Sequence, residues 1–554
     1  MKVTAIFERL RNSRTFSHIA TVTIILIPYL AHVYFTLSLS DWLVDDAGIS
    51  YVYARNLAAG HGLVSQPGME PVEGYSNFLW IIIMVPFFFL NVFDPFITGK
   101  AISLALVALT FYLLHKSLHL LSEGNVVVSF TVLSCLALNA SFTAWTCSGL
   151  ENPLFVALLA GLLYQQIRYI DKRYSSFHVP MFSGLLVSAL AMTHPDGIAY
   201  AFVFPLTIAL ALLSKQRSGV LSLLRALAMY AISLIVVLGG FILFRYLYFG
   251  DILPNTYYVK GGPSLKVLVP SLTLQGGYLT KFQQISGSVL GAPWWWLVPV
   301  VWICLFTLVV CRKQRWREYI LLVGLSVATG YVYLIMPNDY MGEFRFATAF
   351  FPFFYCCLVL FGRFLIAGVS LQPGLRRVVA GVFLLCLLYQ TAATHLPRLK
   401  KFSERKVISF ARIARDYGER FNKYAEAFQI PGATFLVPDI GGTLYYSKLR
   451  IYDLAGLCDK TIARTRGKDQ QHFYDYVFDT LKPTFLHIHG YFTAVSKFDE
   501  DPRFRRDYIA IEEHIDQYVE RVYKVSRFSG DYVRRDVVAG QEMTLDSLRK
   551  RYFP

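Results

Sequence analysis

The chain has 554 residues, of which 55% are hydrophobic and 16% aromatic, whereas only 16% are charged. This composition excludes an ordinary soluble protein and indicates a multi-spanning membrane protein. The formal net charge is +16, but the basic residues cluster in short loops between apolar segments, which is typical of cytoplasmic loops and argues against nucleic acid as a partner. The eight cysteines have no paired spacing, so neither a disulfide framework nor a zinc site is indicated.

Apolar segments predict about eleven transmembrane helices. The first follows several basic residues and is longer than a signal-peptide core, which indicates a retained span with a cytoplasmic amino terminus. The predicted spans are residues 18–39, 97–119, 125–145, 151–170, 180–194, 197–214, 220–247, 291–311, 319–336, 346–369 and 376–395.

A further apolar segment, residues 77–93 (NFLWIIIMVPFFFLNVF), is interrupted by Pro86. If this segment does not cross the membrane, most loop lysines and arginines lie inside, as the positive-inside rule requires; if it crosses, most of them lie outside. We therefore predict a re-entrant or interfacial segment. The acid-rich and glycine-rich motifs of the chain then fall on the outer face.

The composition changes near Leu396 to a mixed, charged chain. We predict a transmembrane domain over residues 1–395 and an extracytoplasmic α/β domain over residues 396–554. TFLVPDI, RIYDLAGL and PTFLHIHG are predicted strands, and SERKVISFARIARDYGERFNKYAEAF is predicted to be helical. His487 and His489 would face the same side of the third strand, but without a third ligand nearby we interpret them as structural.

Two adjacent acids follow the first predicted span, in VDDAGISYVYARNLAAGHGLV. Apolar residues at helical spacing come directly after them, so a helix cap would explain Asp45. A cap does not explain Asp46, because two neighbouring carboxylates repel each other unless a cation or a hydroxyl substrate satisfies them. We therefore predict a functional role for at least one of the pair.

Other polar residues at outer span ends are candidates for binding, each with a structural alternative. Asp196 would otherwise cap a helix, Glu343 would form an ion pair, and Lys260 would lie at the membrane interface. Arg345 has the forked guanidinium that suits a lipid phosphate, and Lys260 is a second phosphate candidate. The predicted substrate-binding residues are Glu73, Tyr75, Asn77, Glu151, His194, Asp196, Asn255, Tyr257, Asp339 and Glu343.

The motifs together resemble the bacterial membrane glycosyltransferases of the GT-C class, and most of all the relatives of the mycobacterial terminal β-(1→2)-arabinofuranosyltransferase. The resemblance runs in order from about Asp45 to Asp459, with departures at Gly48, at His194 and at Asn338–Asp339. The motifs that carry it are DDAGISYVYARNLAAGHGLV, PVEGYSNFLW, SGLE, HPDG, GDILPNTYYVK, NDYMGEFRF and DIGGTLYYSKLRIYDLAGLCD.

This resemblance implies a GT-C fold in the bacterial inner membrane, a polyprenyl-phosphate sugar donor and an active site on the outer face. The expected reaction moves a pentofuranose, D-arabinofuranose above others, onto an envelope glycan or glycoprotein. Asp45 is then expected to be the main catalytic carboxylate, with Asp46 as its partner, because an acceptor hydroxyl needs a nearby base. Asp439 and Asp453, at predicted strand ends of the periplasmic domain, are expected to bind the acceptor.

Two alternatives stay open at this point. The same scaffold suits transfer of another lipid-linked sugar, such as a hexose or aminoarabinose. A lipid-linked sugar transporter or flippase fits the number of spans, but the acids lie at the outer face rather than at mid-membrane in paired halves. Membrane lipids are expected partners, and no cofactor is assigned, although a divalent cation stays open.

Overall fold

The computed structural model of the chain describes residues 14–214, 219–260, 270–312, 315–337 and 340–553. The chain forms two compact units, each built from three stretches of sequence. The membrane unit comprises Met1–Asp41, Ile97–Phe241 and Pro263–Val407, and the α/β unit comprises Trp42–Phe96, Ile242–Gly262 and Ile408–Pro554.

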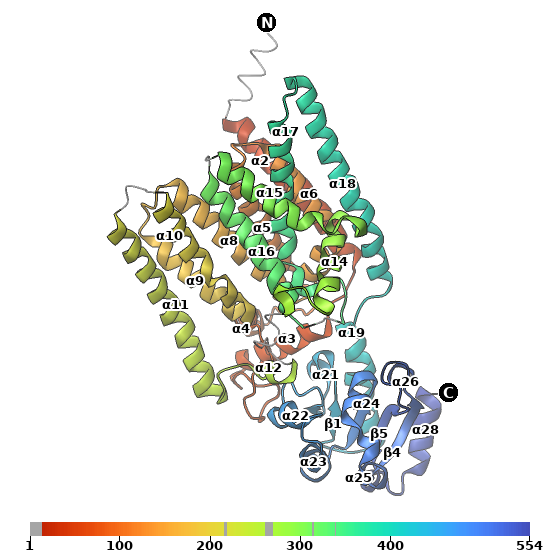
Figure 1. Ribbon diagram of the computed structural model, residues 1–554. Coiled ribbons are helices and arrows are strands. Elements are labelled where there is room, and N and C mark those ends of the chain that lie inside the picture. Colours follow the sequence, from red (N-terminus) through yellow and green to blue (C-terminus); the bar gives the residue numbers. More distant parts are fainter. Residues whose placement is uncertain (1–13, 215–218, 261–269, 313–314, 338–339, 554) are drawn as a thin grey trace. The chain divides into compact units, whose positions relative to one another are not determined.

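The membrane unit is a bundle of helices (Figure 1). The last turns of α11 belong to the α/β unit. The helices are α2 (Arg14–Ser38), α5 (Thr98–Leu121), α6 (Val126–Leu138), α7 (Ala140–Thr146), α8 (Asn152–Asp171), α9 (His178–Thr193), η1 (Pro195–Phe202), α10 (Val203–Leu213), α11 (Val220–Phe249), α14 (Gly277–Leu290), η2 (Ala292–Trp294), α15 (Leu297–Arg312), α16 (Trp316–Ile335), η3 (Arg345–Ala347), α17 (Phe350–Gly368) and α18 (Pro373–Glu404).

Each predicted span overlaps a helix, and the chain is a multi-pass membrane protein. Within the described residues, seven helices are long and apolar enough to cross a membrane, or eight if α6 and α7 form one span bent by 70°. The predicted count of eleven is therefore higher than helix length alone supports. Three of the predicted spans correspond to shorter apolar helices, namely Val22–Ser38, His178–Thr193 and Leu297–Val310.

The bend between α6 and α7 has a local cause at Asn139. Its side chain accepts a hydrogen bond from the backbone N–H of Phe142 at 2.8 Å, which caps the second helix. Burial then separates central helices from peripheral ones. α8 buries 72% of its apolar window inside the protein, whereas α11 and α18 each bury 17%. Apolar faces left open on a span are expected to contact lipid, so α11 and α18 lie at the rim of the bundle.

Residues 77–93 contain α4 (Phe78–Phe89), a helix of 12 residues that belongs to the α/β unit. At 1.5 Å per residue it is roughly 18 Å long, whereas the hydrocarbon core of a bilayer is about 30 Å thick. A helix of this length fits the predicted non-crossing segment. The inside or outside position of each loop stays a prediction.

The α/β unit places a five-stranded sheet among short helices (Figure 1). Its elements are α3 (Asp45–Ala58), α4, α12 (Asn255–Lys260), α19 (Phe410–Ile413), η4 (Ala414–Glu419), α20 (Arg420–Ala427), β1 (Thr434–Val437), α21 (Gly441–Tyr446), β2 (Arg450–Asp453), α22 (Lys460–Thr465), α23 (Gln470–Asp475), η5 (Tyr476–Leu481), β3 (Phe485–Ile488), α24 (Gly490–Ser496), η6 (Phe498–Glu500), α25 (Pro502–Asp507), β4 (Tyr508–Ile515), α26 (Gln517–Tyr523), β5 (Phe528–Arg534), α27 (Arg535–Val538) and α28 (Glu542–Tyr552).

The strand order of the sheet is β2-β1-β3-β5-β4. β1 pairs in parallel with β2 and β3, whereas β5 pairs antiparallel with β3 and β4. The three strands predicted from the sequence are confirmed as β1, β2 and β3. Because β1 and β3 are parallel neighbours, the residues that follow them meet at one edge of the sheet, where open α/β sheets place their ligands.

The helical stretch predicted before β1 is interrupted. α18 ends at Glu404, and Ser409 forms a bridge with Val44, so the backbone of this region pairs with the start of α3. The N–H of Asp45 donates to the carbonyl of Ile408 at 2.9 Å. The predicted domain boundary at residue 396 falls inside α18 and stays a division based on sequence.

Candidate functional site

Asp45 is the first residue of α3, and its side chain is only 4% exposed. Its carboxylate does not cap α3. It accepts hydrogen bonds from the N–H groups of Gly441 at 3.0 Å and Gly442 at 2.7 Å, the first two residues of α21. Burial raises the pKa of Asp45 well above its usual range, and the Asp439 carboxylate adds to the rise. Both oxygens of Asp45 therefore satisfy open amides of another helix.

The two helices also approach each other closely. A Cβ atom on Gly48 of α3 would lie 2.6 Å from the carbonyl carbon of Gly441, and one on Gly441 would collide with the Asp45 carbonyl. At the other end of α21, Arg55 donates to the carbonyls of Tyr445 at 3.0 Å and Leu444 at 3.3 Å. An acid at the first turn of α21 and a base at its last turn complement the helix dipole. This contact accounts for the glycine at position 48.

Asp46, the second acid of the pair, is half-buried, and its charge adds to the field at Asp45. Asp439 lies two residues after the end of β1, and Asp453 is the last residue of β2. Asp453 accepts a hydrogen bond from the N–H of Cys458 at 2.7 Å, and burial raises the pKa of Asp453 to about 7. Asp453 therefore lies inside the α/β unit, where it organises the loop after β2.

Glu73, in the loop before α4, forms a buried ion pair. Arg245, near the end of α11, lies against Glu73, with Nε 2.6 Å from Oε2 and Nη2 3.0 Å from Oε1. Burial raises the pKa of Glu73, and the Arg245 guanidinium counteracts that rise. The Tyr75 side chain is buried beside this pair, and Asn77 exchanges hydrogen bonds with Ser50 at 3.0 and 3.2 Å. These predicted sugar ligands are buried within the α/β unit, and their binding role stays a prediction.

Asn255 and its neighbours connect α12 to the loop after β2. The Asn255 side chain donates to the carbonyls of Gly456 and Leu457, each at 2.8 Å. Tyr257 and Lys260 lie on the same short helix with exposed side chains. Asn255 therefore has a structural contact, whereas Tyr257 and Lys260 are accessible.

The membrane unit has a cleft that combines three of the predicted motifs. It forms where the chain turns from α9 into η1, because His194 is extended and Pro195 starts the next helix. The Asp196 carboxylate bonds to the His194 ring and does not cap η1. The cavity measures about 40 Å³, so a sugar requires side-chain movement to enter. Its lining is Glu151, Asn152, Phe155, Val156, His194, Asp196, Tyr200, Arg345, Phe346, Thr348 and Ala349.

Arg345 lines this cleft, is 8% exposed and lies over two aromatic rings. Its guanidinium carbon lies 5.7 Å from the ring centroid of Trp145 and 5.4 Å from that of Phe346. The backbone carbonyl of Arg345 also accepts a hydrogen bond from Asn152 at 3.2 Å. Cation–π contacts with two rings favour one orientation of the planar fork.

Glu343 does not line this cleft. Its carboxylate pairs with Arg398 at 2.7 Å and accepts a hydrogen bond from Ser141 at 3.2 Å, so the ion-pair alternative describes it. Asp339 lies outside the described residues. Arg245 and Arg398 were missed as partners of predicted acids, although Arg245 lies within an apolar span, where a charged residue is a signal in itself. In the described part of the chain, no group of three or more His, Cys, Asp or Glu side chains is arranged to hold a metal ion.

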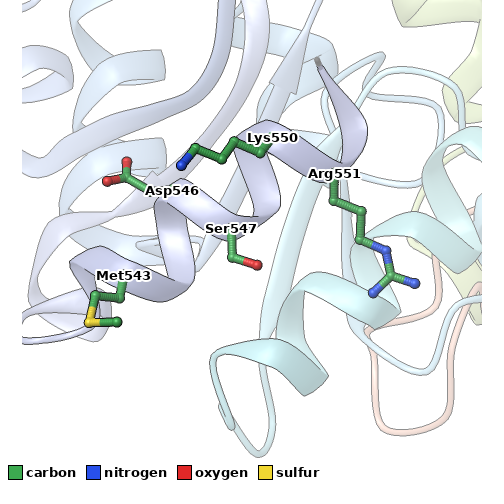
Figure 2. Close-up of a pocket in the computed structure, with 5 residues that line it drawn as sticks. All are labelled: Met543, Asp546, Ser547, Lys550 and Arg551. Atoms are coloured by element: carbon green, nitrogen blue, oxygen red, sulfur yellow. The ribbon is translucent and has the colours of Figure 1, made fainter.

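Figure 2 shows a shallow depression on α28, lined by Met543, Asp546, Ser547, Lys550 and Arg551. These side chains project from one helix in several directions, and Met543 is almost fully exposed. The lining contains no predicted site residue. We assign no function to this surface.

Residues 411–543 match a family described as a domain of unknown function (DUF8728). This match covers a part of the α/β unit only. A search of curated proteins finds no match.

Several solved structures are similar in fold to most of this chain. The Archaeoglobus fulgidus oligosaccharyltransferase in complex with Zn and sulfate has a TM-score of 0.51 at 12% identity, over 84% of this chain and 67% of that one. The same enzyme tethered with an acceptor peptide containing the NVT sequon also has a TM-score of 0.51, at 11% identity over 85% and 69%. ArnT from Cupriavidus metallidurans bound to undecaprenyl phosphate has a TM-score of 0.47 at 11% identity, over 79% and 86%. The oligosaccharyltransferase comparisons confirm the predicted GT-C fold.

Proposed function

We propose that this chain is a GT-C glycosyltransferase that transfers a sugar from a polyprenyl phosphate to an envelope glycan or glycoprotein. The observation that carries the proposal is the cleft of the membrane unit, where Arg345 meets Glu151, His194 and Asp196. A cation beside several hydrogen-bonding acids suits a sugar joined to a phosphate. The fold shared with an oligosaccharyltransferase, an enzyme whose acceptor is a peptide, supports the same reaction class.

Arg345 would stabilise the leaving group. As the bond between the anomeric carbon and the lipid phosphate breaks, negative charge develops on the phosphate oxygens. A guanidinium can donate two parallel hydrogen bonds to them, and in a water-poor site a preorganised donor is worth about 3–4 kcal/mol. The rings of Trp145 and Phe346 restrict Arg345 before the donor binds. Lys260 is retained as a second phosphate contact on the basis of the sequence.

Sugar hydroxyls would be bound by the acids of the cleft. Glu151 and Asp196 offer carboxylate oxygens, and the contact with His194 holds the Asp196 carboxylate in one position. Carboxylates that accept from two neighbouring hydroxyls orient a sugar ring strongly, because each bond is charge-assisted. Orientation of the donor is a large part of catalysis when two substrates must meet.

The acid pair at the start of α3 would act on the acceptor. Asp45 uses both carboxylate oxygens to hold α21, so we assign it a positioning role rather than the catalytic role first expected. Asp46 is half-buried, and we propose that it orients an acceptor hydroxyl. Asp439 remains the proposed acceptor ligand of the α/β unit, since it lies at the sheet edge beside Asp45.

The motif resemblance favours a pentofuranose, D-arabinofuranose above a hexose or aminoarabinose. The test is transfer by the full-length protein in lipid nanodiscs, supplied with one polyprenyl-phosphoryl sugar at a time and an envelope glycan. Mass spectrometry should show an acceptor heavier by one pentose and an equal amount of free polyprenyl phosphate. Transfer of a hexose instead would change the sugar only. Movement of intact donor between leaflets without product would favour a flippase and overturn the proposal.

A further inference from the structure

Two residues that line the cleft of the membrane unit each have a polar group that bonds to nothing in the described part of the chain. These groups are the side-chain carbonyl oxygen of Asn152 and the hydroxyl of Tyr200. Both residues belong to the membrane unit and line the same cavity as Arg345. Neither is among the site residues predicted from the sequence, so the cleft contains more unused polar groups than the motifs indicate.

The hydrogen bonds of the Asn152 amide group determine which of its atoms is left open. Its nitrogen donates to the backbone carbonyl of Arg345 at 3.2 Å and to the hydroxyl of Thr348 at 3.1 Å. The Thr348 hydroxyl in turn donates to the Arg345 carbonyl at 2.7 Å, so both partners of the amide act as acceptors. The nitrogen of Asn152 must therefore face them, and both of its N–H bonds are used. Its oxygen, Oδ1, is left buried without a donor.

The unpaired oxygen of Asn152 indicates what kind of group binds there. A buried acceptor without a donor is unusual in a native protein, because burial removes the water that would otherwise bond to it. The phosphodiester of a lipid-linked sugar carries no hydrogen at neutral pH and cannot supply one to Asn152. A hydroxyl group can donate its hydrogen, so the missing partner of Asn152 fits a sugar better than a phosphate.

Tyr200 is the second lining residue with an unused group. It is 1% exposed and lies in η1, four residues after Asp196. Its ring meets that of Phe155 edge to face, with the centroids 5.8 Å apart. η1 also packs closely against the end of α9, since a Cβ atom on Gly197 would collide with the backbone of Leu190. These contacts position the Tyr200 ring, but none of them uses its hydroxyl.

The size of the cavity limits what can bind in it. Its volume is about 40 Å³, whereas one water needs roughly 10–15 Å³. A hydroxyl group with its carbon fits into this space without movement of the side chains, whereas a sugar ring does not. A hydroxyl group also matches both unused groups, because it can donate its hydrogen to Asn152 and accept one from Tyr200.

We infer that Asn152 Oδ1 and the Tyr200 hydroxyl form a specificity site for a hydroxyl group of the transferred sugar. This inference rests on the proposed function. The sugar hydroxyl donates to the carbonyl oxygen of Asn152, and the Tyr200 hydroxyl donates to the sugar oxygen. The two side chains bind and orient the donor, and they exchange no proton with it. A donor that lacks this hydroxyl leaves both side chains buried without a partner.

Thermal unfolding of the full-length protein in nanodiscs distinguishes this role from a structural one. Tyr200→Phe keeps the ring and removes a hydroxyl that the described chain does not use, so the unfolding midpoint should stay unchanged. The matched control is Tyr230→Phe, because the Tyr230 hydroxyl donates to the carbonyl of Ala201 at 2.6 Å. Loss of that hydrogen bond should lower the midpoint. An equal decrease in both variants would overturn the inference, because the Tyr200 hydroxyl would then have a partner in the fold.

Donors that lack one hydroxyl at a time test recognition directly. The protein is supplied with polyprenyl-phosphoryl arabinofuranose or with its 2-, 3- or 5-deoxy analogue, and transfer to an envelope glycan is measured. One analogue should lower the kcat/KM of the wild type by about 10²-fold or more. In Tyr200→Phe and in Asn152→Ala, the ratio between parent donor and analogue should fall toward one. A structural role predicts lower rates with an unchanged ratio, and that result would overturn the inference.

The same measurement separates the inference from the proposed function. Tyr230→Phe should keep the wild-type ratio between parent donor and analogue, since its hydroxyl is used within the fold. An active wild type that accepts all three deoxy donors as well as the parent would overturn the inference alone. A wild type that transfers no sugar would overturn the proposed function, and the specificity site with it.

Discussion

The membrane unit and the α/β unit both bury ionisable residues, but they use them differently. In the membrane unit, Glu151, Asp196 and Arg345 line a cavity of about 40 Å³. In the α/β unit, the carboxylates of Asp45 and Glu73 are occupied by two backbone amides and by Arg245, respectively. Burial alone therefore does not identify a functional acid. An acid whose oxygens already accept hydrogen bonds within the fold stabilises the structure, whereas an acid with unused lone pairs can bind substrate.

The largest effect is expected from breaking the buried ion pair of the α/β unit. Glu73→Gln leaves the Arg245 charge buried without its counterion, which should lower the free energy of unfolding by about 3–5 kcal/mol. Thermal unfolding of the purified protein measures this. The matched control is Glu70→Gln, because Glu70 pairs with Lys460 at 2.9 Å on the surface and should matter by about 0–1 kcal/mol. Equal losses of unfolding free energy in both variants would show that burial does not make the Glu73–Arg245 pair more important than a surface pair.

The cleft should respond in activity rather than in stability. Arg345→Gln removes the charge that would stabilise the leaving phosphate, so kcat should fall by about 10²–10³-fold. Single-turnover transfer at saturating donor measures this effect. Arg225→Gln, an exposed arginine of α11, is the control and should be neutral. A stable Arg345→Gln protein with normal turnover would remove the cleft from the mechanism.

Asp453 should make the stability of the α/β unit depend on pH. Burial raises the pKa of Asp453 to about 7 in the folded protein, whereas the unfolded chain ionises near its usual value of about 3.9. Between these two pKa values the folded protein holds a proton on Asp453 that the unfolded chain has lost. The stabilisation that protonated Asp453 contributes is therefore lost as the pH rises from about 4 to about 7. Asp453→Asn should be more stable than the wild type at pH 8 by on the order of 2–4 kcal/mol, with no gain at pH 4. An equal difference at both pH values would contradict the shift.

The smallest effect is expected from Asp45→Asn. The amide keeps one acceptor oxygen but points an N–H toward an amide N–H of α21, which should lower stability by about 1–3 kcal/mol. Turnover should fall as well, because Asp439 lies two residues before Gly441. Asp46→Asn should lower turnover without the loss of stability, and Asp41→Asn, at an exposed acid, is the control. Unchanged stability in Asp45→Asn would contradict its role in holding α21.

Much of the fold follows from local sequence patterns. Each predicted span overlaps a helix, and β1, β2 and β3 are short apolar runs that the sequence identifies. β4 and β5 were missed because they carry charged and glycine residues, and β4 contains a bulge between Ala510 and Glu512. The break before α19 was also missed, since it depends on a bridge between Val44 and Ser409, which are distant in sequence.

The sequence predicts only part of the candidate site, because it shows local patterns but not long-range contacts. Ionisable residues at span ends are a local signal, and this signal predicts Glu151, His194, Asp196 and Arg345, which line one cleft. The partners of Asp45 and His487 are long-range, because they come from α21 and from β5. Because the sequence does not predict β5, it does not connect His487 to Asp531, which lies 2.6 Å from it, and it favours a structural role for both histidines.

The most direct test of the account asks where the donor phosphate binds. A polyprenyl-phosphoryl pentose with a diazirine on the isoprene unit next to the phosphate is bound to the full-length protein in nanodiscs and activated by light. Peptide mass spectrometry then locates the label. If the cleft binds the donor phosphate, label is expected on residues 150–156 and 341–349, and both Arg345→Gln and excess unlabelled donor should reduce it. Label confined to the α/β unit, unaffected by Arg345→Gln, would contradict it.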